Sequence, residues 1–320
     1  MSFAVPTRRS FALAMGGAVS ALTAAAGRGL SAAAGREFNS PYNFINIDKA
    51  GSVVTFNYSL VAGRMSAIDL SRPAYQVVPY TRYYYAAELI RPNPRQVLMA
   101  GLGAGGFNRL FNLVHPDSRL VSVEIDPMIL SLAQEHTGFR TGPNNEVVVE
   151  DARTFLRRSR ETFDWILLDA FDRNAQIPVH LTTREFYESL SGRLADDGAV
   201  LTNLHQGTRF FASQVQTIRA VFPDVVLVPV ESRTNVIVAA AKAPAGSIRK
   251  RLTAPAPDVL ARYREHGVNF DEIARNMTYE RDYLAYLGEG AVVLTDDFAP
   301  VESLARRPLP DIVPSRPGRP

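Results

Sequence analysis

The chain contains no cysteine, and this absence excludes three kinds of chemistry. Disulfide bonds, thiolate catalysis and cysteine-ligated metal sites all need a residue that the sequence does not have. The absence leaves the compartment open, because an exported protein need not use disulfides. Histidine is also scarce, with five residues in 320, and none of them stands out as a partner for hydride transfer.

The chain also lacks a long uninterrupted hydrophobic run. The apolar stretch near its start ends at Ala26 and is rich in glycine, so we expect no stable membrane span. This stretch follows the twin-arginine pattern of Thr7–Leu13 and precedes Ser31–Ala34, which offers a cleavage site before Gly35. Residues 1–34 are therefore predicted to be a twin-arginine export signal, and the mature protein to be periplasmic or extracytoplasmic.

A basic surplus is nearly absent as well, with 35 lysine and arginine residues against 32 acidic ones. The predicted signal contains three of the arginines and no acidic residue, so the remainder carries 32 charges of each sign. A balanced chain has no electrostatic footprint for nucleic acid. We therefore expect no nucleic-acid partner.

The first part of the expected mature chain, residues 35–91, is predicted to form a small β domain with a connecting helix. Apolar and polar residues partly alternate over 42–47 and again over 53–58, around a turn that contains Gly51. Two short β-type runs around such a turn are typical of a β-hairpin.

Residues 92–243 show short apolar runs that alternate with helical patterns. Such runs are typical of strands buried on both faces of a parallel sheet, and here they are followed by two β-type runs without a clear helix between them. The fold class is thus α/β, with a Rossmann-type, mostly parallel sheet that has an antiparallel pair at one end. The expected strands lie at 97–100, 120–124, 147–149, 165–169, 200–203, 225–230 and 236–241.

Two less regular segments follow the sheet. Residues 244–307 are richer in proline and are predicted to be a helical extension, whereas 308–320 contain five prolines and little that could pack, so we expect a disordered tail. Within the sheet domain, Thr182–Glu185 has the spacing of a capping box, and Gly198 follows the helix that it is predicted to start.

The strongest functional pattern is the glycine-rich turn after the first strand of the sheet. Gly101, Gly103 and Gly105 stand where the backbone must turn sharply and approach a ligand beside a helix N-terminus. Glu124 ends the next strand, about twenty residues later, where a carboxylate can accept both hydroxyls of a ribose. This pattern serves dinucleotides and adenosyl-sulfonium compounds alike.

Further carboxylates follow the next two strands. Asp151 comes after the third strand and is placed to bond an adenine amino group, while Asp169 and Asp172 come after the fourth. Because ligands of open α/β sheets bind at the carboxyl ends of the strands, we expect these side chains to converge on one site.

Together these motifs resemble the spermidine synthase family of polyamine aminopropyltransferases, in particular the divergent subgroup that is also found fused to membrane transporters. The resemblance covers roughly residues 38–305, and it is carried by the segments 97–106, 123–127, 150–152, 169–172, 177–186 and 294–302. It implies a methyltransferase-like Rossmann domain with a seven-stranded, mostly parallel sheet and a small N-terminal β domain.

The resemblance also implies roles for individual residues. Decarboxylated S-adenosylmethionine, or S-adenosylmethionine itself, would lie over the glycine turn, and Asp169 and Asp172 would hold a small-molecule amine and carry the catalysis, without a metal. Where family members have an aspartate in the glycine turn, this chain has Ala104. A homodimer or homotetramer is a further implication. The donor site would comprise Gly101, Gly103, Gly105, Glu124, Asp126, Asp151 and Ala152, and the acceptor site Tyr42, Tyr80 and Asp172.

Several functions remain open at this point. Aminopropyl transfer to an amine is the leading hypothesis, in which Asp169 takes the proton that the attacking nitrogen must lose. Methyl transfer from S-adenosylmethionine, a non-catalytic polyamine or nucleoside binder of the cell envelope, and a nicotinamide-dependent enzyme are the alternatives.

Overall fold

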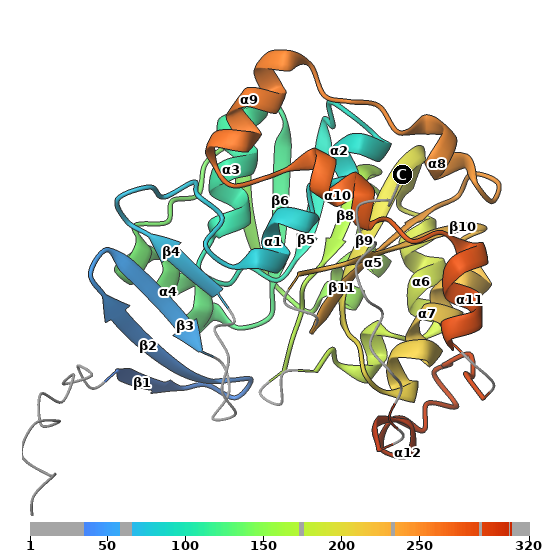
Figure 1. Ribbon diagram of the computed structural model, residues 1–320. Coiled ribbons are helices and arrows are strands. Elements are labelled where there is room, and N and C mark those ends of the chain that lie inside the picture. Colours follow the sequence, from blue (N-terminus) through green and yellow to red (C-terminus); the bar gives the residue numbers. More distant parts are fainter. Residues whose placement is uncertain are drawn as a thin grey trace, which may run out of the picture. The chain divides into compact units, whose positions relative to one another are not determined.

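The computed structural model describes residues 35–57, 66–172, 176–231, 234–287, 290–306 and 308, and Gly35–Pro320 form one compact unit (Figure 1). The predicted export signal lies outside the described residues, as does the predicted tail apart from residue 308. No helix within the described ranges is long and apolar enough to cross a bilayer.

The centre of this unit is a seven-stranded sheet in which the expected strands all occur. Its spatial order is β10-β11-β9-β8-β5-β6-β7, with parallel pairing from β9 to β7 and antiparallel pairing of β11 with both of its neighbours. The predicted mostly parallel sheet with an antiparallel end is thus confirmed. The strands are β5 Gln96–Ala100, β6 Arg119–Glu124, β7 Asn145–Val149, β8 Phe163–Leu168, β9 Leu194–His205, β10 Asp224–Pro229 and β11 Asn235–Ala241.

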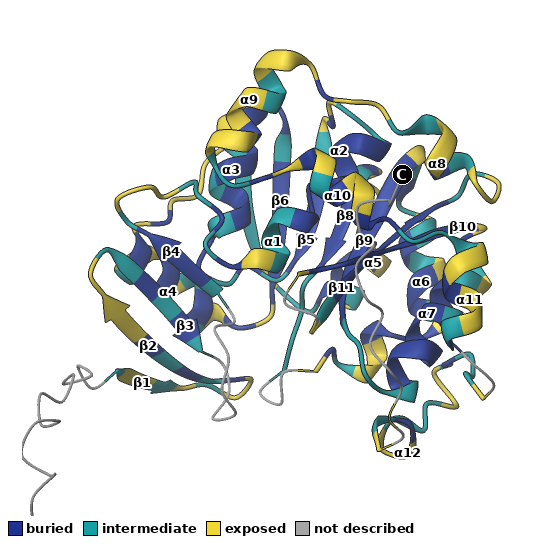
Figure 2. Ribbon diagram, viewed as in Figure 1, coloured by how far each residue is buried: buried dark blue, intermediate teal, exposed yellow. Residues whose placement is uncertain are grey.

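Helices cover both faces of this sheet, as the uninterrupted apolar strands require. Along β5, Leu98 and Ala100 belong to one buried apolar cluster, and Val97 and Met99 to the other. Figure 2 shows the central strands buried and the outer surfaces of several helices exposed. One face carries α5 Ala152–Arg158, α6 Arg184–Ser191, α7 Arg209–Val221 and α11 Glu280–Leu287, and the other α1 Pro79–Tyr83, α2 Ala86–Ile90, α3 Gly106–Val114, α8 Ser247–Arg251, α9 Pro257–Glu265 and α10 Phe270–Asn276.

The N-terminal element is larger than the predicted hairpin. It is a four-stranded antiparallel sheet whose two middle strands are the expected pair, with one short strand added on each side. Its apolar face packs on α4 Pro127–Thr137 and on the glycine turn, and this buries Ala104 completely. The strands are β1 Arg36–Asn39, β2 Phe44–Ala50, β3 Val53–Asn57 and β4 Ser66–Asp69.

Two local predictions about the start and end of α6 were wrong. The helix is capped by Thr183, whose hydroxyl accepts from the backbone N–H of Phe186, and not by Thr182. Glu185 turns away from the cap and accepts from the backbone N–H of Asp296, so there is no capping box. Gly198 lies inside β9, because the helix already ends at Ser191.

The segment after β11 is built from short helices. It contains α8 to α11 and ends with α12 Val301–Ala305. Between α11 and α12, Leu294 is fully buried against Phe210 and Leu304, so this irregular stretch is fixed on the surface of the sheet domain.

Candidate active site

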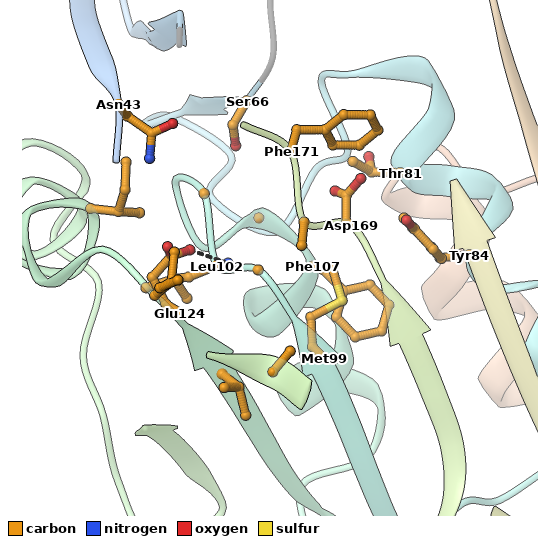
Figure 3. A pocket seen from close by; sticks show the side chains of 18 of the residues that line it. Asn43, Ser66, Thr81, Tyr84, Met99, Leu102, Phe107, Glu124, Asp169 and Phe171 are labelled. Atoms are coloured by element: carbon orange, nitrogen blue, oxygen red, sulfur yellow. Dashed lines mark hydrogen bonds between the residues drawn. The ribbon is translucent and has the colours of Figure 1, made fainter. Parts of the chain in front are cut away.

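A cavity of about 290 Å³ lies at the carboxyl ends of β5, β6 and β8 (Figure 3). The chain order reverses here, because β6 and β7 follow on one side of β5 and β8 and β9 on the other. Such a switch point is where open α/β sheets bind ligands. Figure 3 shows Glu124 on one side of the hollow and Asp169, with Thr81, Tyr84 and Phe171, on the other.

The glycine turn passes directly over the end of β8. Gly101 has φ +100°, and a Cβ placed on it would lie 2.6 Å from the carbonyl oxygen of Asp169. Any other residue would push the two strand ends apart, so this glycine keeps the turn and the Asp169 loop in contact. Gly101 and Gly103, which were predicted to bind the donor, both line the cavity.

Glu124 is held by two backbone N–H groups. Its Oε2 accepts from Leu102 at 3.0 Å and its Oε1 from Asp126 at 3.0 Å, and the residue is only 8% exposed. Burial raises the pKa of Glu124 to about 7, although these backbone hydrogen bonds oppose the rise. Each carboxylate oxygen keeps a lone pair, so a ribose diol can still bind there.

Two side chains donate hydrogen bonds to the Asp169 carboxylate, on the side of the cavity opposite Glu124. Asn203 Nδ2 donates to its Oδ1 at 3.0 Å, and the Tyr80 hydroxyl donates to its Oδ2 at 3.0 Å. Burial raises the pKa of Asp169 against these hydrogen bonds. A carboxylate that is fixed in place and has a raised pKa is suited to accept a proton from a bound amine.

Two further predicted carboxylates also reach the cavity. Asp172 lines it; its backbone N–H donates to the Gln176 carbonyl at 2.8 Å, and its Oδ1 accepts from the backbone N–H of Gln176 at 3.1 Å. Asp151 lines it beside Ala152, caps α5 through the backbone N–H of Thr154, and lies 2.8 Å from His180 Nε2. Burial tends to raise the pKa of Asp151, but the hydrogen bonds from His180 and Thr154 outweigh it, and the net direction is downward.

Two residues predicted to bind the donor do not line the cavity. Asp126 is fully buried, and its carboxylate caps α4 at Met128 and accepts from Ser40 and Asn43. Gly105 has φ +80° beneath the ring of Phe139, and a Cβ on it would lie 2.4 Å from that ring. Asp126 therefore holds the start of α4, and Gly105 leaves room for the ring of Phe139.

The predicted acceptor residues lie at the cavity, together with partners that the sequence did not reveal. Tyr42 and Tyr80 both line it. The bond from Asn203 to Asp169 was missed, although Asn203 is a polar residue near the end of an apolar strand, like Asp169 itself. Tyr84 was missed too, since it stands in a tyrosine-rich stretch, and its hydroxyl donates to the Leu168 carbonyl at 2.7 Å.

Metal ligands are not gathered at this site. Within the described part of the chain, no three histidine, aspartate or glutamate side chains are placed to hold a metal ion together.

Comparison with known proteins shows which family this chain resembles in sequence. A family model, the spermine/spermidine synthase domain, matches residues 85–235. The polyamine aminopropyltransferase of Vibrio vulnificus is 29% identical over 231 residues, 71% of this chain and 75% of that protein. The polyamine aminopropyltransferase of Chromobacterium violaceum is 31% identical over 177 residues, 55% of this chain and 67% of that protein.

Solved structures show the same fold at lower identity. A probable spermidine synthase from Corynebacterium glutamicum superposes with a TM-score of 0.65 at 20% identity, over 83% of this chain and 98% of that one. Spermidine synthase from Thermotoga maritima superposes with a TM-score of 0.56, also at 20% identity, over 80% and 84% of the two chains. The sequence similarity therefore shows that the chain belongs to the spermine/spermidine synthase family of polyamine aminopropyltransferases.

Proposed function

We propose that this protein transfers an aminopropyl group from decarboxylated S-adenosylmethionine to an amine acceptor. The observation that carries the proposal is the Asp169 carboxylate, which Asn203 and Tyr80 hold in place. It lines the same cavity as Glu124, on the opposite side. The similarity to polyamine aminopropyltransferases supports the reaction class.

The residues fit an adenosyl-sulfonium donor. Glu124 offers free lone pairs to ribose hydroxyls, and the absence of a side chain at Gly101 and Gly103 leaves room for a ligand above the turn. Asp151 presents an acceptor for the adenine amino group. When bound, the donor supplies an activated carbon attached to a good leaving group.

Asp169 and Asp172 provide the negative charge that an ammonium-bearing acceptor needs. The attacking nitrogen must first lose a proton, and Asp169 is the group that takes it. Its raised pKa makes the difference from the pKa of the acceptor ammonium smaller, so proton transfer becomes easier. A nitrogen–carbon bond then forms as the carbon–sulfur bond breaks, and the sulfur leaves as a neutral thioether. Holding nitrogen and carbon in line supplies the remaining acceleration.

Methyl transfer from intact S-adenosylmethionine is the second candidate, and Ala104 is the observation that favours it. Its methyl side chain is fully buried among apolar residues, so the turn offers no carboxylate for the amino group of a transferred aminopropyl chain. The two reactions differ in their products, and one experiment separates them.

The test is product analysis of the purified full-length protein, supplied with each sulfonium compound and a panel of mono- and diamines. We expect an aminopropylated amine and 5′-methylthioadenosine from the decarboxylated donor. The Asp169→Asn variant should bind 5′-methylthioadenosine normally and turn over about 10²–10⁴ times more slowly. Asp297→Asn, an exposed position that does not line the cavity, serves as a control. A methylated product would favour the second candidate, and failure to bind either sulfonium compound would contradict both.

We further propose that residues 1–34 direct export by the twin-arginine route. The support is the order of the paired arginines, the apolar stretch and the small-residue cleavage site in the sequence.

A further inference from the structure

The irregular segment Leu294–Asp297 is fixed between α6 and α7. The backbone N–H of Leu294 donates to the Thr217 hydroxyl at 2.8 Å, and its carbonyl accepts from the backbone N–H of Arg184 at 2.8 Å. Neither bond involves the cavity. One side chain of the segment, Asp296, is nevertheless linked to the cavity through a series of hydrogen bonds.

Asp296 is the most connected side chain of this segment. Its carboxylate accepts from both terminal nitrogens of Arg153, with 2.8 Å between Nη1 and Oδ1, and from the Thr183 hydroxyl at 2.8 Å. Its backbone N–H donates to Glu185. The hydrogen bonds from Arg153 lower the pKa of Asp296 to about 2, so it is charged at any ordinary pH. A two-pronged pair of this kind fixes orientation as well as distance.

Arg153 passes this constraint on to the cavity. The same Nη1 also donates to the backbone carbonyl of His180 at 3.1 Å, in the short 3₁₀ helix η1, Val179–Leu181. The ring of His180 in turn lies 2.8 Å from Asp151 Oδ2, where an ionised carboxylate can only accept. Asp296, Arg153, His180 and Asp151 thus form a continuous chain, of which only the last two line the cavity.

The end of this chain controls how the Asp151 carboxylate points. Its Oδ1 is engaged by the backbone N–H of Thr154 and its Oδ2 by His180. These contacts hold the carboxylate in one orientation at the cavity, which Asp151 lines. We propose that Asp296 is a positioning residue for nucleoside recognition, which acts through Arg153 and His180 to aim Asp151 at the 6-amino group of a purine. This inference rests on the proposed adenosyl-sulfonium site.

A residue that aims Asp151 should affect the binding of 6-amino and 6-oxo purines differently, whereas a merely structural residue would not. A 6-amino purine presents a hydrogen-bond donor to Asp151, whereas a 6-oxo purine presents an acceptor that an ionised carboxylate repels. The preference of the protein for adenine over hypoxanthine should therefore depend on Asp296. General loosening of the fold would weaken the binding of both nucleosides equally.

Calorimetric titration of the full-length protein with 5′-methylthioadenosine and 5′-methylthioinosine tests this inference. We expect the parent to prefer the adenine nucleoside by about tenfold or more, and Asp296→Asn to erase most of that ratio. Asp297→Asn, at the adjacent exposed position, should keep the ratio. Thermal unfolding of each variant shows whether it is folded.

His180→Ala provides a second variant, because its half-exposed ring is not needed for packing. It should lose the same discrimination, since Asp151 then lacks its partner. Folded Asp296→Asn and His180→Ala variants that both keep the parental ratio would overturn the inference. If the unsubstituted protein binds neither nucleoside, the proposed function is contradicted. If it binds both without preferring adenine, the proposed orientation of Asp151 toward the 6-amino group is contradicted.

Discussion

Burial brings the pKa of Glu124 to about 7, so the residue that is placed for the ribose changes its charge within the ordinary pH range. Ribose hydroxyls donate to the ionised carboxylate, and its protonated form has less acceptor capacity. We therefore expect the affinity for 5′-methylthioadenosine to rise about tenfold between pH 6 and pH 8. Calorimetric titration across this range measures the change.

The Glu124→Gln variant identifies the group responsible. It should bind the nucleoside weakly and with little dependence on pH, whereas a parental pH profile in this variant would assign the titration to another residue. Stability should change in the opposite sense. The folded-state pKa lies above the ordinary 4.5, so the folded protein holds a proton that the unfolded chain releases, and the contribution of Glu124 to stability falls as the pH rises from about 4.5 to 7.

The resemblance to the spermidine synthase family implies an acidic residue where this chain has Ala104, and the surroundings of Ala104 predict the effect of introducing one. The residue is fully buried in the apolar cluster beneath the N-terminal sheet, and its backbone N–H donates to the Ser66 hydroxyl at 2.9 Å. Ala104→Asp should place an unpaired charge there and destabilise the protein by about 3 kcal/mol or more.

Denaturant unfolding monitors this change, and Ala104→Ser is the control because it adds a small uncharged group at the same point. An Ala104→Asp variant with parental stability and a faster aminopropyl transfer would show that the side chain turns into the cavity.

At the scale of elements, Asp126 joins the start of α4 to the segment that precedes β2. It begins α4 at the backbone N–H of Met128 and accepts from the side chains of Ser40 and Asn43, which precede β2. Asp126→Ala should remove the helix cap and leave buried polar groups unpaired, at a cost of about 2–4 kcal/mol. Thermal unfolding measures it, with Asp117→Ala as a control. Unchanged stability together with a lost nucleoside affinity would instead support the donor-binding role that the sequence suggested.

The sequence predicted the elements that are long, apolar and buried on both faces. The strands β5, β6, β8 and β11 read as apolar runs because helices cover both sides of them. The outer strands β1 and β4 are four residues each and mostly polar at their ends, so nothing in their pattern separates them from loops. The cap of α6 was misplaced by one residue, because Thr182 and Thr183 have equal capping propensity and tertiary contacts decide between them.

The candidate site was predictable to the same degree. Strand ends meet at one edge of a parallel sheet, so Glu124, Asp151 and Asp169 could be brought together from their positions alone. Partners from distant segments, such as Tyr80 and Asn203 at Asp169, depend on how helices and strands pack and are not contained in any local pattern. The sequence did not distinguish Gly101 from Gly105, yet the two contact different neighbours. Gly101 lies against the Asp169 carbonyl and Gly105 against the ring of Phe139.

At the scale of the whole molecule, the site depends on segments from almost the entire unit. The N-terminal sheet covers the glycine turn, the central sheet supplies the carboxylates, and the segment before α12 holds α5 and η1 in place. Removal of the N-terminal sheet or of the segment around Asp296 would therefore affect the cavity.

The cellular location of the protein should depend on the paired arginines Arg8 and Arg9. Twin-arginine export requires the paired arginines, and lysine preserves their charge while removing the guanidinium groups. We expect Arg8→Lys combined with Arg9→Lys to keep the chain in the cytosol, while the parent reaches the cell envelope and begins near Gly35. Cell fractionation with N-terminal sequencing measures both, and Arg28→Lys, a like change inside the predicted signal but outside the pair, is the control. Equal export of parent and double variant would show that residues 1–34 are not a twin-arginine signal.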